Sequence, residues 1–217
     1  MSKKHVFYLI LSVLLFDQLS KFYVKTHFEL GQEWVVLSWF KILFIENDGM
    51  AWGAKLSDIF SFISDESAKL FLTLFRLVAV LGIGYWLFDS IKKHASKLLT
   101  FAIALIFSGA FGNIIDSVFY GMIFNHSYGQ KATIFAENNY SGLFYGKVVD
   151  MLHFPLFSGY FPNWMPFIGG DYFTFFNPVF NIADIAISTG VGLLLLYNSK
   201  NATSKHTLTQ NDKSDLE

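Results

Sequence analysis

Residues 178–197 read PVFNIADIAISTGVGLLLLY, an apolar run that is long enough to cross a bilayer and carries one acid, Asp184. An ionised side chain in hydrocarbon is costly, so an acid at this position is a candidate for function. Asn177 and Pro178 suit a helix cap and a first helical residue. The run therefore predicts a membrane helix from Pro178, with its positive dipole end towards Asp184.

The rest of the chain also has the composition of a membrane protein. Of its 217 residues, 53% are hydrophobic and 15% are charged, whereas soluble domains carry roughly 25% charged residues. Three further apolar runs reach spanning length, at residues 6–24, 70–88 and 98–115. The sequence predicts an all-α membrane protein, a bundle of four transmembrane helices with both termini on one side.

The distribution of lysine predicts the orientation, because cationic residues are retained on the cytoplasmic side. Lysines precede the first run, crowd the connection 89–97 and follow the last run. We expect cytoplasmic N- and C-termini, with outer loops at about 25–69 and 116–177. Residues 1–197 are predicted to form one membrane-embedded domain, and residues 198–217 a polar cytoplasmic tail without regular structure.

Several classes of site are disfavoured by composition. The net charge of −1 comes without the clustered basic face that binding of nucleic acid requires. The absence of cysteine removes thiolate nucleophiles and thiolate metal ligands. The candidate metal ligands among the histidines are His27, His94, His126 and His153. Their spacing is not that of a metal site, so we expect no metal and no other cofactor.

Polar residues recur on one face of each predicted helix, and those with charge lie toward the predicted outer end. Asp17 and Asp184 fall roughly 10 Å below the outer boundary at ~1.5 Å per residue. This pattern predicts one polar pocket that opens outward. The residues are Asp17, Ser20 and Lys21 in the first span, Thr73 and Arg76 in the second, Gly109, Gly112, Asn113 and Asp116 in the third, and Asn177, Asn181, Asp184 and Ser188 in the fourth.

A structural role is the alternative for some of these groups. Asp17 and Lys21 are spaced as an i,i+4 ion pair, and Arg76 could pair with a carboxylate and hold helices together. The sequence leaves both interpretations open for these three residues. It favours function more strongly for Asp184, which has no evident cation in its own helix.

Outside the spans, residues 40–45 are typical of a strand, closed by a turn at Asn47-Asp48-Gly49. Residues 145–149 are able to pair with this strand. A small extracytoplasmic sheet over the pocket would then carry Asp150 to its edge. Two carboxylates, Asp150 and Asp184, are therefore expected near one membrane face.

Five motifs in this order resemble those of the lipoprotein signal peptidases, the type II signal peptidases of bacteria. The resemblance covers roughly residues 6–196. The motifs are Asp17-Gln18-Leu19-Ser20-Lys21, Asn47-Asp48-Gly49-Met50-Ala51-Trp52, Gly112-Asn113-Ile114-Ile115-Asp116, Val148-Val149-Asp150-Met151 and Phe180-Asn181-Ile182-Ala183-Asp184.

The resemblance implies an aspartyl endopeptidase of the cytoplasmic (inner) membrane. Such an enzyme removes the signal peptide of prolipoproteins before the diacylglyceryl-modified cysteine, in contact with membrane lipids, and we expect a monomer. Asp150 and Asp184 match the catalytic pair of the family. The positions that match supporting site residues are Asp17, Lys21, Asn47, Gly49, Gly109, Asn113, Asp116, Asn181 and Ala183.

Two features depart from the family pattern. Ser117 stands where the family commonly has arginine, and Arg76 or Lys147 is a candidate to replace that charge. The stretches 118–147 and 151–177 are longer than in the compact form of the family.

Paired carboxylates offer a route to peptide hydrolysis without a thiol or a metal. Held close together, two acids cannot both stay ionised, so they share one proton, and one activates water while the other protonates the scissile carbonyl. The main alternative is a small proton-coupled transporter with a relay through the intramembrane acids, although internal repeats are absent. A non-enzymatic membrane assembly factor is a third hypothesis.

Overall fold

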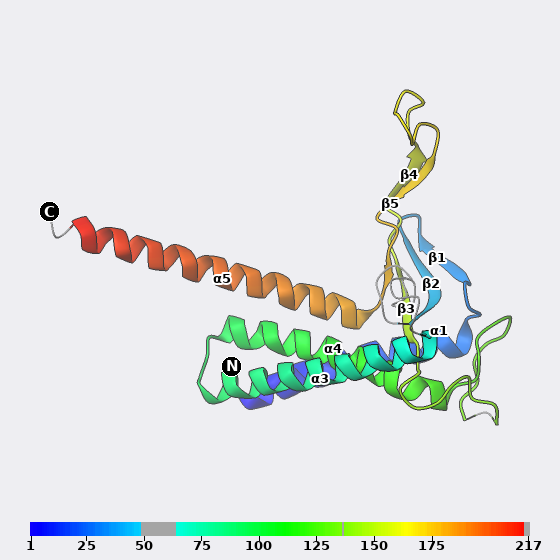
Figure 1. Cartoon of the computed structure of the whole chain (residues 1–217), viewed down its shortest axis with the longest axis horizontal. Coiled ribbons are helices and arrows are strands. Elements are labelled where there is room, and N and C mark those ends of the chain that lie inside the picture. Colours follow the sequence, from blue (N-terminus) through cyan, green and yellow to red (C-terminus); the bar gives the residue numbers. More distant parts are fainter. Residues whose placement is uncertain (49–63, 136, 215–217) are drawn as a thin grey trace. The chain divides into compact units, whose positions relative to one another are not determined.

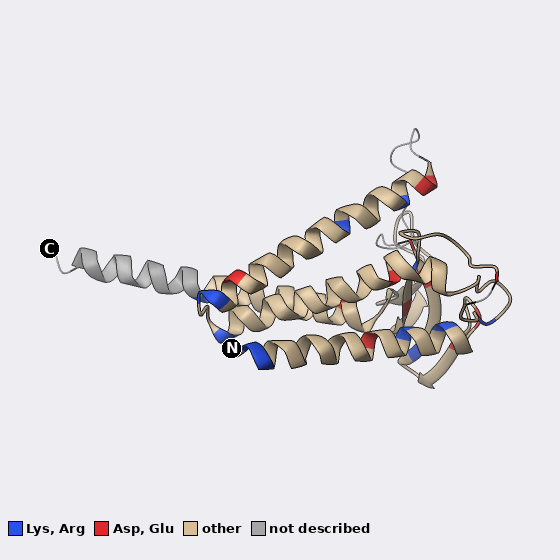
Figure 2. Ribbon diagram, turned by 90° about the horizontal axis from the view of Figure 1, so that it is seen from below, with Lys and Arg blue, Asp and Glu red and all other residues tan. Residues whose placement is uncertain are grey.

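The computed structural model describes residues 1–48, 64–135 and 137–214, with the backbone alone from residue 201. Four of its helices are long and apolar enough to cross a membrane, as the fold prediction expected. They are α1 (Lys3–His27), α3 (Asp65–Lys92), α4 (Lys97–Ile123) and α5 (Ile182–Ser214). Figure 2 shows that charged residues are sparse along these helices and gather mainly near their ends.

Two of the helices begin at a serine cap. The Ser64 hydroxyl accepts a hydrogen bond from the Ser67 amide at 3.2 Å, and α3 follows directly. The Ser96 hydroxyl accepts from the Leu99 amide at 3.1 Å and caps α4 in the same way. Each cap satisfies an amide that has no partner inside its own helix.

The start of the fourth helix differs from the prediction. The helix begins at Ile182 rather than Pro178, and Val179–Phe180 forms a short strand, β6. This strand pairs with His153 and Leu152, far back in the chain. Because that pairing is non-local, helix signals near Pro178 could not reveal it. Asp184 consequently lies in the first turn of α5, and Asn177 and Asn181 precede the helix.

The polar tail also differs from the prediction, because α5 continues as a helix to Ser214. Helical hydrogen bonds are local, so an established helix propagates at little cost per added residue.

A four-stranded sheet has the order β1-β2-β3-β6, from β1 (Glu33–Leu37), β2 (Phe40–Asn47), β3 (Val148–His153) and β6. The predicted strand at 40–45 and its pairing with the segment before Asp150 are confirmed, since β2 and β3 pair antiparallel. Asp150 lies within β3 and pairs with Ile45 of β2. The pairing of β3 with β6 involves Leu152 and His153, two and three residues further along the strand.

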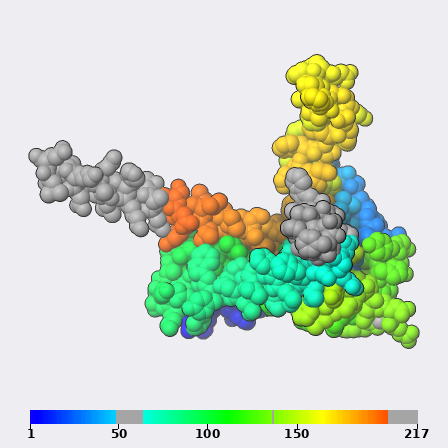
Figure 3. Space-filling model, in the orientation of Figure 1, coloured from blue at the N-terminus to red at the C-terminus, as the bar shows by residue number. Residues whose placement is uncertain are grey.

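A separate hairpin consists of β4 (Phe157–Tyr160) and β5 (Tyr172–Phe175). Figure 1 shows it (yellow) extending from the sheet as a two-stranded arm, and Figure 3 shows the arm standing out from the surface. It belongs to the long stretch 151–177.

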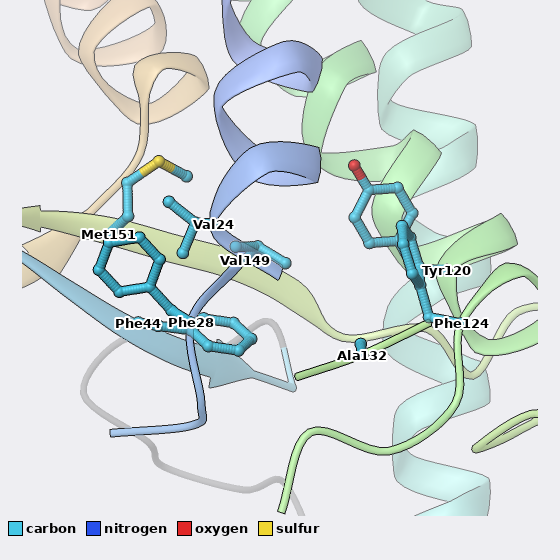
Figure 4. Close-up of a cluster of buried hydrophobic side chains, with 8 residues drawn as sticks. All are labelled: Val24, Phe28, Phe44, Tyr120, Phe124, Ala132, Val149 and Met151. Carbon is cyan, nitrogen blue, oxygen red and sulfur yellow. The ribbon is translucent and has the colours of Figure 1, made fainter. Parts of the chain in front are cut away.

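The chain divides into two compact units. The helical unit contains residues 1–16, 77–112 and 182–217, and its core gathers around Val6, Leu87, Ile103 and Ala104. The sheet unit contains residues 17–76 and 113–181. Its core joins α1 and α4 to the sheet (Figure 4), through the side chains of Val24, Phe28, Phe44, Tyr120, Phe124, Ala132, Val149 and Met151.

Candidate active site

Asp150 lies beside a cavity of about 760 Å³ in the sheet unit. Its side chain is almost fully buried, although the strand that carries it borders the cavity. The residues lining this cavity come from β2, β3 and the segment between β5 and β6: Ile45, Glu46, Asn47, Asp150, Thr174, Phe176, Asn177, Pro178 and Val179. The lining combines apolar side chains with two acids, Glu46 and Asp150, and small-molecule and peptide sites usually combine apolar walls with a few polar groups in this way.

Two asparagine amides hold the Asp150 carboxylate. Asn47, the last residue of β2, donates from Nδ2 to Asp150 Oδ2 at 3.1 Å. Asn181 donates from Nδ2 to Asp150 Oδ1 at 2.7 Å. Each carboxylate oxygen therefore has its own amide donor, which fixes the orientation of the group.

Asn181 is itself held by a second asparagine and by the backbone. Its Nδ2 atom lies 3.2 Å from Asn113 Oδ1 and 3.3 Å from the Val149 carbonyl oxygen. Asn113 Oδ1 accepts a further hydrogen bond, from Lys21 Nζ at 2.8 Å. A continuous series of contacts thus runs from Lys21 through Asn113 and Asn181 to Asp150.

Lys21 is fully buried and bridges two buried acids. Its Nζ atom lies 2.9 Å from Asp17 Oδ2 and 2.8 Å from Asp116 Oδ2. The predicted i,i+4 pair of Asp17 and Lys21 is present, and Asp116 joins it. A buried ion cluster of this kind requires nearly complete pairing to offset desolvation, so it fixes the ammonium that holds Asn113.

Gln18 and Tyr120 extend this cluster and were not predicted as site residues. Gln18 Nε2 donates to Asp116 Oδ1 at 2.9 Å and to Asp17 Oδ2 at 3.1 Å. The Tyr120 hydroxyl donates to Gln18 Oε1 at 3.2 Å. Helical spacing could have suggested Tyr120, because it follows Asp116 by four residues and shares its face of α4.

A cation, Lys21, lies beside Asp116, the residue that precedes Ser117. Ser117 is buried, and its hydroxyl donates to the Asn113 carbonyl oxygen at 3.0 Å. Lys147, one of the two candidates for the missing charge, instead approaches Glu46 Oε2 at 3.7 Å.

A second buried ion pair lies next to Asn47. Lys25 Nζ contacts Glu46 Oε1 at 2.5 Å, and the Ser127 hydroxyl donates to the same oxygen at 2.8 Å. Burial alone would raise the pKa of the Glu46 carboxyl, but the Lys25 ammonium and these hydrogen bonds outweigh burial and hold that pKa below its usual value. The series Asp17, Lys21, Lys25 at four-residue spacing was the signal available in the sequence.

Gly109 and Ala183 meet in the helical unit, where α4 and α5 pack closely. A Cβ atom on Gly109 would lie 2.3 Å from the Ala183 carbonyl oxygen and 2.8 Å from Ile187 Cγ1. Two helical turns along, a Cβ on Gly190 would lie 2.7 Å from the Ala102 carbonyl oxygen. This helix contact therefore requires glycine at both Gly109 and Gly190. The contact includes Ala183, the residue just before Asp184.

The predicted site residues consequently fall into three groups. Asp150 and six others come together in the sheet unit: Asp17, Lys21, Asn47, Asn113, Asp116 and Asn181. Gly109, Ala183 and Asp184 belong to the helical unit, and Asp184 follows Asn181 by three residues. Gly49 lies outside the described residues.

Within the described part of the chain, no three His, Asp or Glu side chains are grouped so that they could hold a metal ion. His153 Nε2 lies 3.1 Å from Asn177 Oδ1. His153 and Asp150 are three positions apart on β3, so their side chains project from opposite faces of the strand.

Comparison with known proteins identifies the family. The family model described as signal peptidase (SPase) II matches residues 9–200. The chain belongs to the signal peptidase II family. It is therefore a multi-pass membrane enzyme of the aspartic peptidase type, and the family match lends no support to the transporter alternative.

Curated relatives support the membership of the chain in the signal peptidase II family. A lipoprotein signal peptidase of Porphyromonas gingivalis is 47% identical over 191 residues, which cover 87% of this chain and 80% of the relative. Those of Amoebophilus asiaticus and Pasteurella multocida are 38% and 29% identical, over 86% and 92% of this chain and 74% and 93% of their own lengths.

A solved structure supports the fold of the family. A bacterial membrane enzyme determined by the in meso method at 2.3 Å resolution superposes with a TM-score of 0.58 at 24% identity, over 94% of this chain and 92% of that chain. The four-helix membrane architecture with small antiparallel sheets is therefore shared with a known membrane enzyme.

Proposed function

We propose that this chain removes the signal peptide of bacterial prolipoproteins by cutting before the diacylglyceryl-modified cysteine. Membership of the signal peptidase II family and the names of the relatives support this activity. The strongest support from the structure is the environment of Asp150, a nearly buried carboxylate held by two amides at the border of a cavity.

Asp150 and Asp184 are the proposed catalytic pair. Asn181 links them along the chain, because it donates to Asp150 and precedes Asp184 by three residues. Asp184 lies in the first turn of α5, where the helix dipole stabilises a negative charge. Family motifs supply the same two residues.

The proposed reaction uses one shared proton. A water molecule attacks the scissile carbonyl carbon while the ionised carboxylate takes a proton from that water and the protonated carboxyl gives its proton to the carbonyl oxygen. Collapse of the tetrahedral intermediate then breaks the C–N bond. The carboxyl that took a proton from water passes it to the leaving amine of the modified cysteine. A hydroxyl of the intermediate returns its proton to the other carboxylate as the carbonyl reforms, so the pair again shares one proton.

The remaining site residues position the pair in this proposal. Asn47 and Asn181 orient Asp150, while Asn113 and Lys21 hold Asn181 in turn. Asp17 and Asp116 anchor the Lys21 ammonium. Gly109 and Ala183 allow the helix contact from which Asp184 projects, and Gly49 is proposed as a supporting residue because it matches the family motif.

We place the enzyme in the cytoplasmic membrane as a monomer, with both termini cytoplasmic and the site near the outer face. The lysines that flank the spans support this orientation. The chain contains no cysteine, so single cysteines report topology cleanly. In spheroplasts, Asn138→Cys should react with a membrane-impermeant maleimide and Lys93→Cys should not; the reverse pattern would overturn the orientation.

The activity is tested with purified protein in nanodiscs and a diacylglyceryl-modified prolipoprotein. Wild-type protein should cleave it, whereas Asp150→Asn and Asp184→Asn should lose cleavage and keep the thermal unfolding of the wild type. Glu137→Gln, at an exposed loop acid, is the matched control and should cleave normally. Undiminished cleavage by either aspartate variant would refute the catalytic assignment.

A further inference from the structure

The hairpin of β4 and β5, residues 157–175, presents large aromatic side chains to its surroundings. We call it the aromatic arm. Phe167 at its tip is fully exposed, Trp164 is 80% exposed and Tyr160 is 72% exposed. Soluble proteins rarely expose such a contiguous apolar surface, so a surface of this kind indicates a site of contact with another protein or with a membrane.

The arm is stiff enough to present these side chains in a fixed arrangement. The rings of Phe157 and Phe175 stack across the two strands with centroids 4.7 Å apart, and those of Phe161 and Phe173 with centroids 4.5 Å apart. The tip is closed by backbone hydrogen bonds, from the Phe161 amide to the Asp171 carbonyl oxygen at 2.9 Å and from the Gly170 amide to the Phe161 carbonyl oxygen at 3.0 Å.

The base of the arm lies close to the membrane because of chain length alone. Six residues, 176–181, separate β5 from the first residue of the spanning helix α5. From Phe175 to Ile182 there are seven Cα–Cα steps, so an extended chain reaches about 25 Å at most. The aromatic arm is therefore tethered within about 25 Å of the first residue of a helix that is apolar and long enough to cross a membrane.

The scarcity of charged residues in the arm favours contact with lipid over contact with another protein. From residue 154 to residue 181, the only charged side chain is Asp171. Trp and Tyr with apolar neighbours are the residues that settle at the level of the lipid headgroups. A hairpin that is aromatic, nearly uncharged and tethered to a spanning helix fits the boundary between headgroups and acyl chains.

We propose that the aromatic arm inserts its tip, around Trp164 and Phe167, into the bilayer interface on the side of the membrane where α5 begins. The arm then acts as a lateral anchor for the sheet unit. This inference goes beyond the proposed peptidase reaction, since it concerns a membrane contact of a segment outside the candidate active site.

Spin labels on single cysteines test the insertion directly, because the natural chain has no cysteine. The protein is reconstituted in nanodiscs of phosphatidylethanolamine and phosphatidylglycerol with a nitroxide at Phe167→Cys, and accessibility to oxygen and to a water-soluble nickel chelate is measured. Ile168→Cys is a second site that keeps both anchor residues. Lipid-facing Val78→Cys and exposed loop position Asn138→Cys provide the two references.

The expected ratio of oxygen to nickel accessibility at Phe167→Cys and Ile168→Cys is several-fold above that at Asn138→Cys and approaches that at Val78→Cys. Replacing Trp164 and Phe167 by serine in the Ile168→Cys protein should return the label to the loop value. High nickel accessibility at both tip sites would overturn the proposal. Low accessibility to both reagents would also overturn it, since the tip would then be covered by protein, including a second copy.

The outcome does not depend on catalysis. Asp184→Asn combined with Phe167→Cys should give the same accessibility ratio as Phe167→Cys alone. Failure of the proposed peptidase activity would leave this measurement unchanged, and failure of insertion would leave the cleavage assay unchanged.

Discussion

The Asn181 amide donates to Asp150 Oδ1 at 2.7 Å, and Asn181 stands three residues before Asp184. One side chain therefore contacts the first proposed catalytic acid while its backbone leads into the helix turn that carries the second. The contact also ends a series of polar interactions that starts at Lys21. This series explains why an asparagine outside the helix belongs to the site.

Replacing Asn181 by alanine should lower kcat roughly 10- to 100-fold with little change in KM, because a hydrogen bond to a charged group contributes about 1.5–3 kcal/mol. Cleavage kinetics with a lipid-modified prolipoprotein measure this. Asn138→Ala removes an exposed loop amide and serves as the control, with unchanged kinetics. A change confined to KM would mean that Asn181 binds substrate rather than orienting Asp150.

Lys21→Met should destabilise the protein by about 3–5 kcal/mol, since it leaves Asp17 and Asp116 buried without their cation. Thermal unfolding in detergent should show a large fall in Tm. Adding Asp17→Asn and Asp116→Asn to Lys21→Met should recover part of that loss, because the buried charges are then gone. A triple variant less stable than Lys21→Met would contradict the role of Lys21 as the partner of both acids.

Gly109→Ala should destabilise the protein by about 1–3 kcal/mol, because the new methyl group would lie 2.3 Å from the Ala183 carbonyl oxygen. Both Tm and cleavage should fall. Gly82→Ala and Gly192→Ala are matched helical controls with no atom within 4 Å of the new methyl group. These controls should match or exceed wild-type stability, since alanine favours a helix. Equal losses in all three variants would rule out a specific contact between α4 and α5.

Glu46 should make the stability of the protein depend on acid pH. Its folded-state pKa lies below the ordinary value of 4.5, so its stabilising contribution is complete above that value and is lost as the pH falls through the lower folded pKa. The Tm difference between wild type and Glu46→Gln should be large at neutral pH and shrink below about pH 4.5.

The control for this pH series is Glu33→Gln, which removes the partially exposed ion pair with Lys41. Exposed pairs contribute at most about 1 kcal/mol, so this variant should show a small and nearly constant Tm difference. A difference for Glu46→Gln that stays constant from pH 7 to pH 3 would show that the Lys25–Glu46 pair does not stabilise the folded state.

The sequence by itself determined the four spanning helices, the strand at 40–45 and the family motifs. The length of an apolar run, the alternation of a strand and a short motif are local properties. Each can be recognised in the sequence without knowledge of the tertiary contacts. Local helix signals were misleading at Pro178, where pairing with β3 makes a strand of Val179 and Phe180.

Only the tertiary structure decided which polar residues meet. Lys21, Asn113, Asn181 and Asp150 come from two helices, a strand and the segment before α5, and their contacts depend on distances between elements that no sequence period encodes. The same holds for the close approach of Gly109 to Ala183. Burial supplies the physical reason, since a polar group removed from water is stable only with partners in place, and the fold alone brings those partners together.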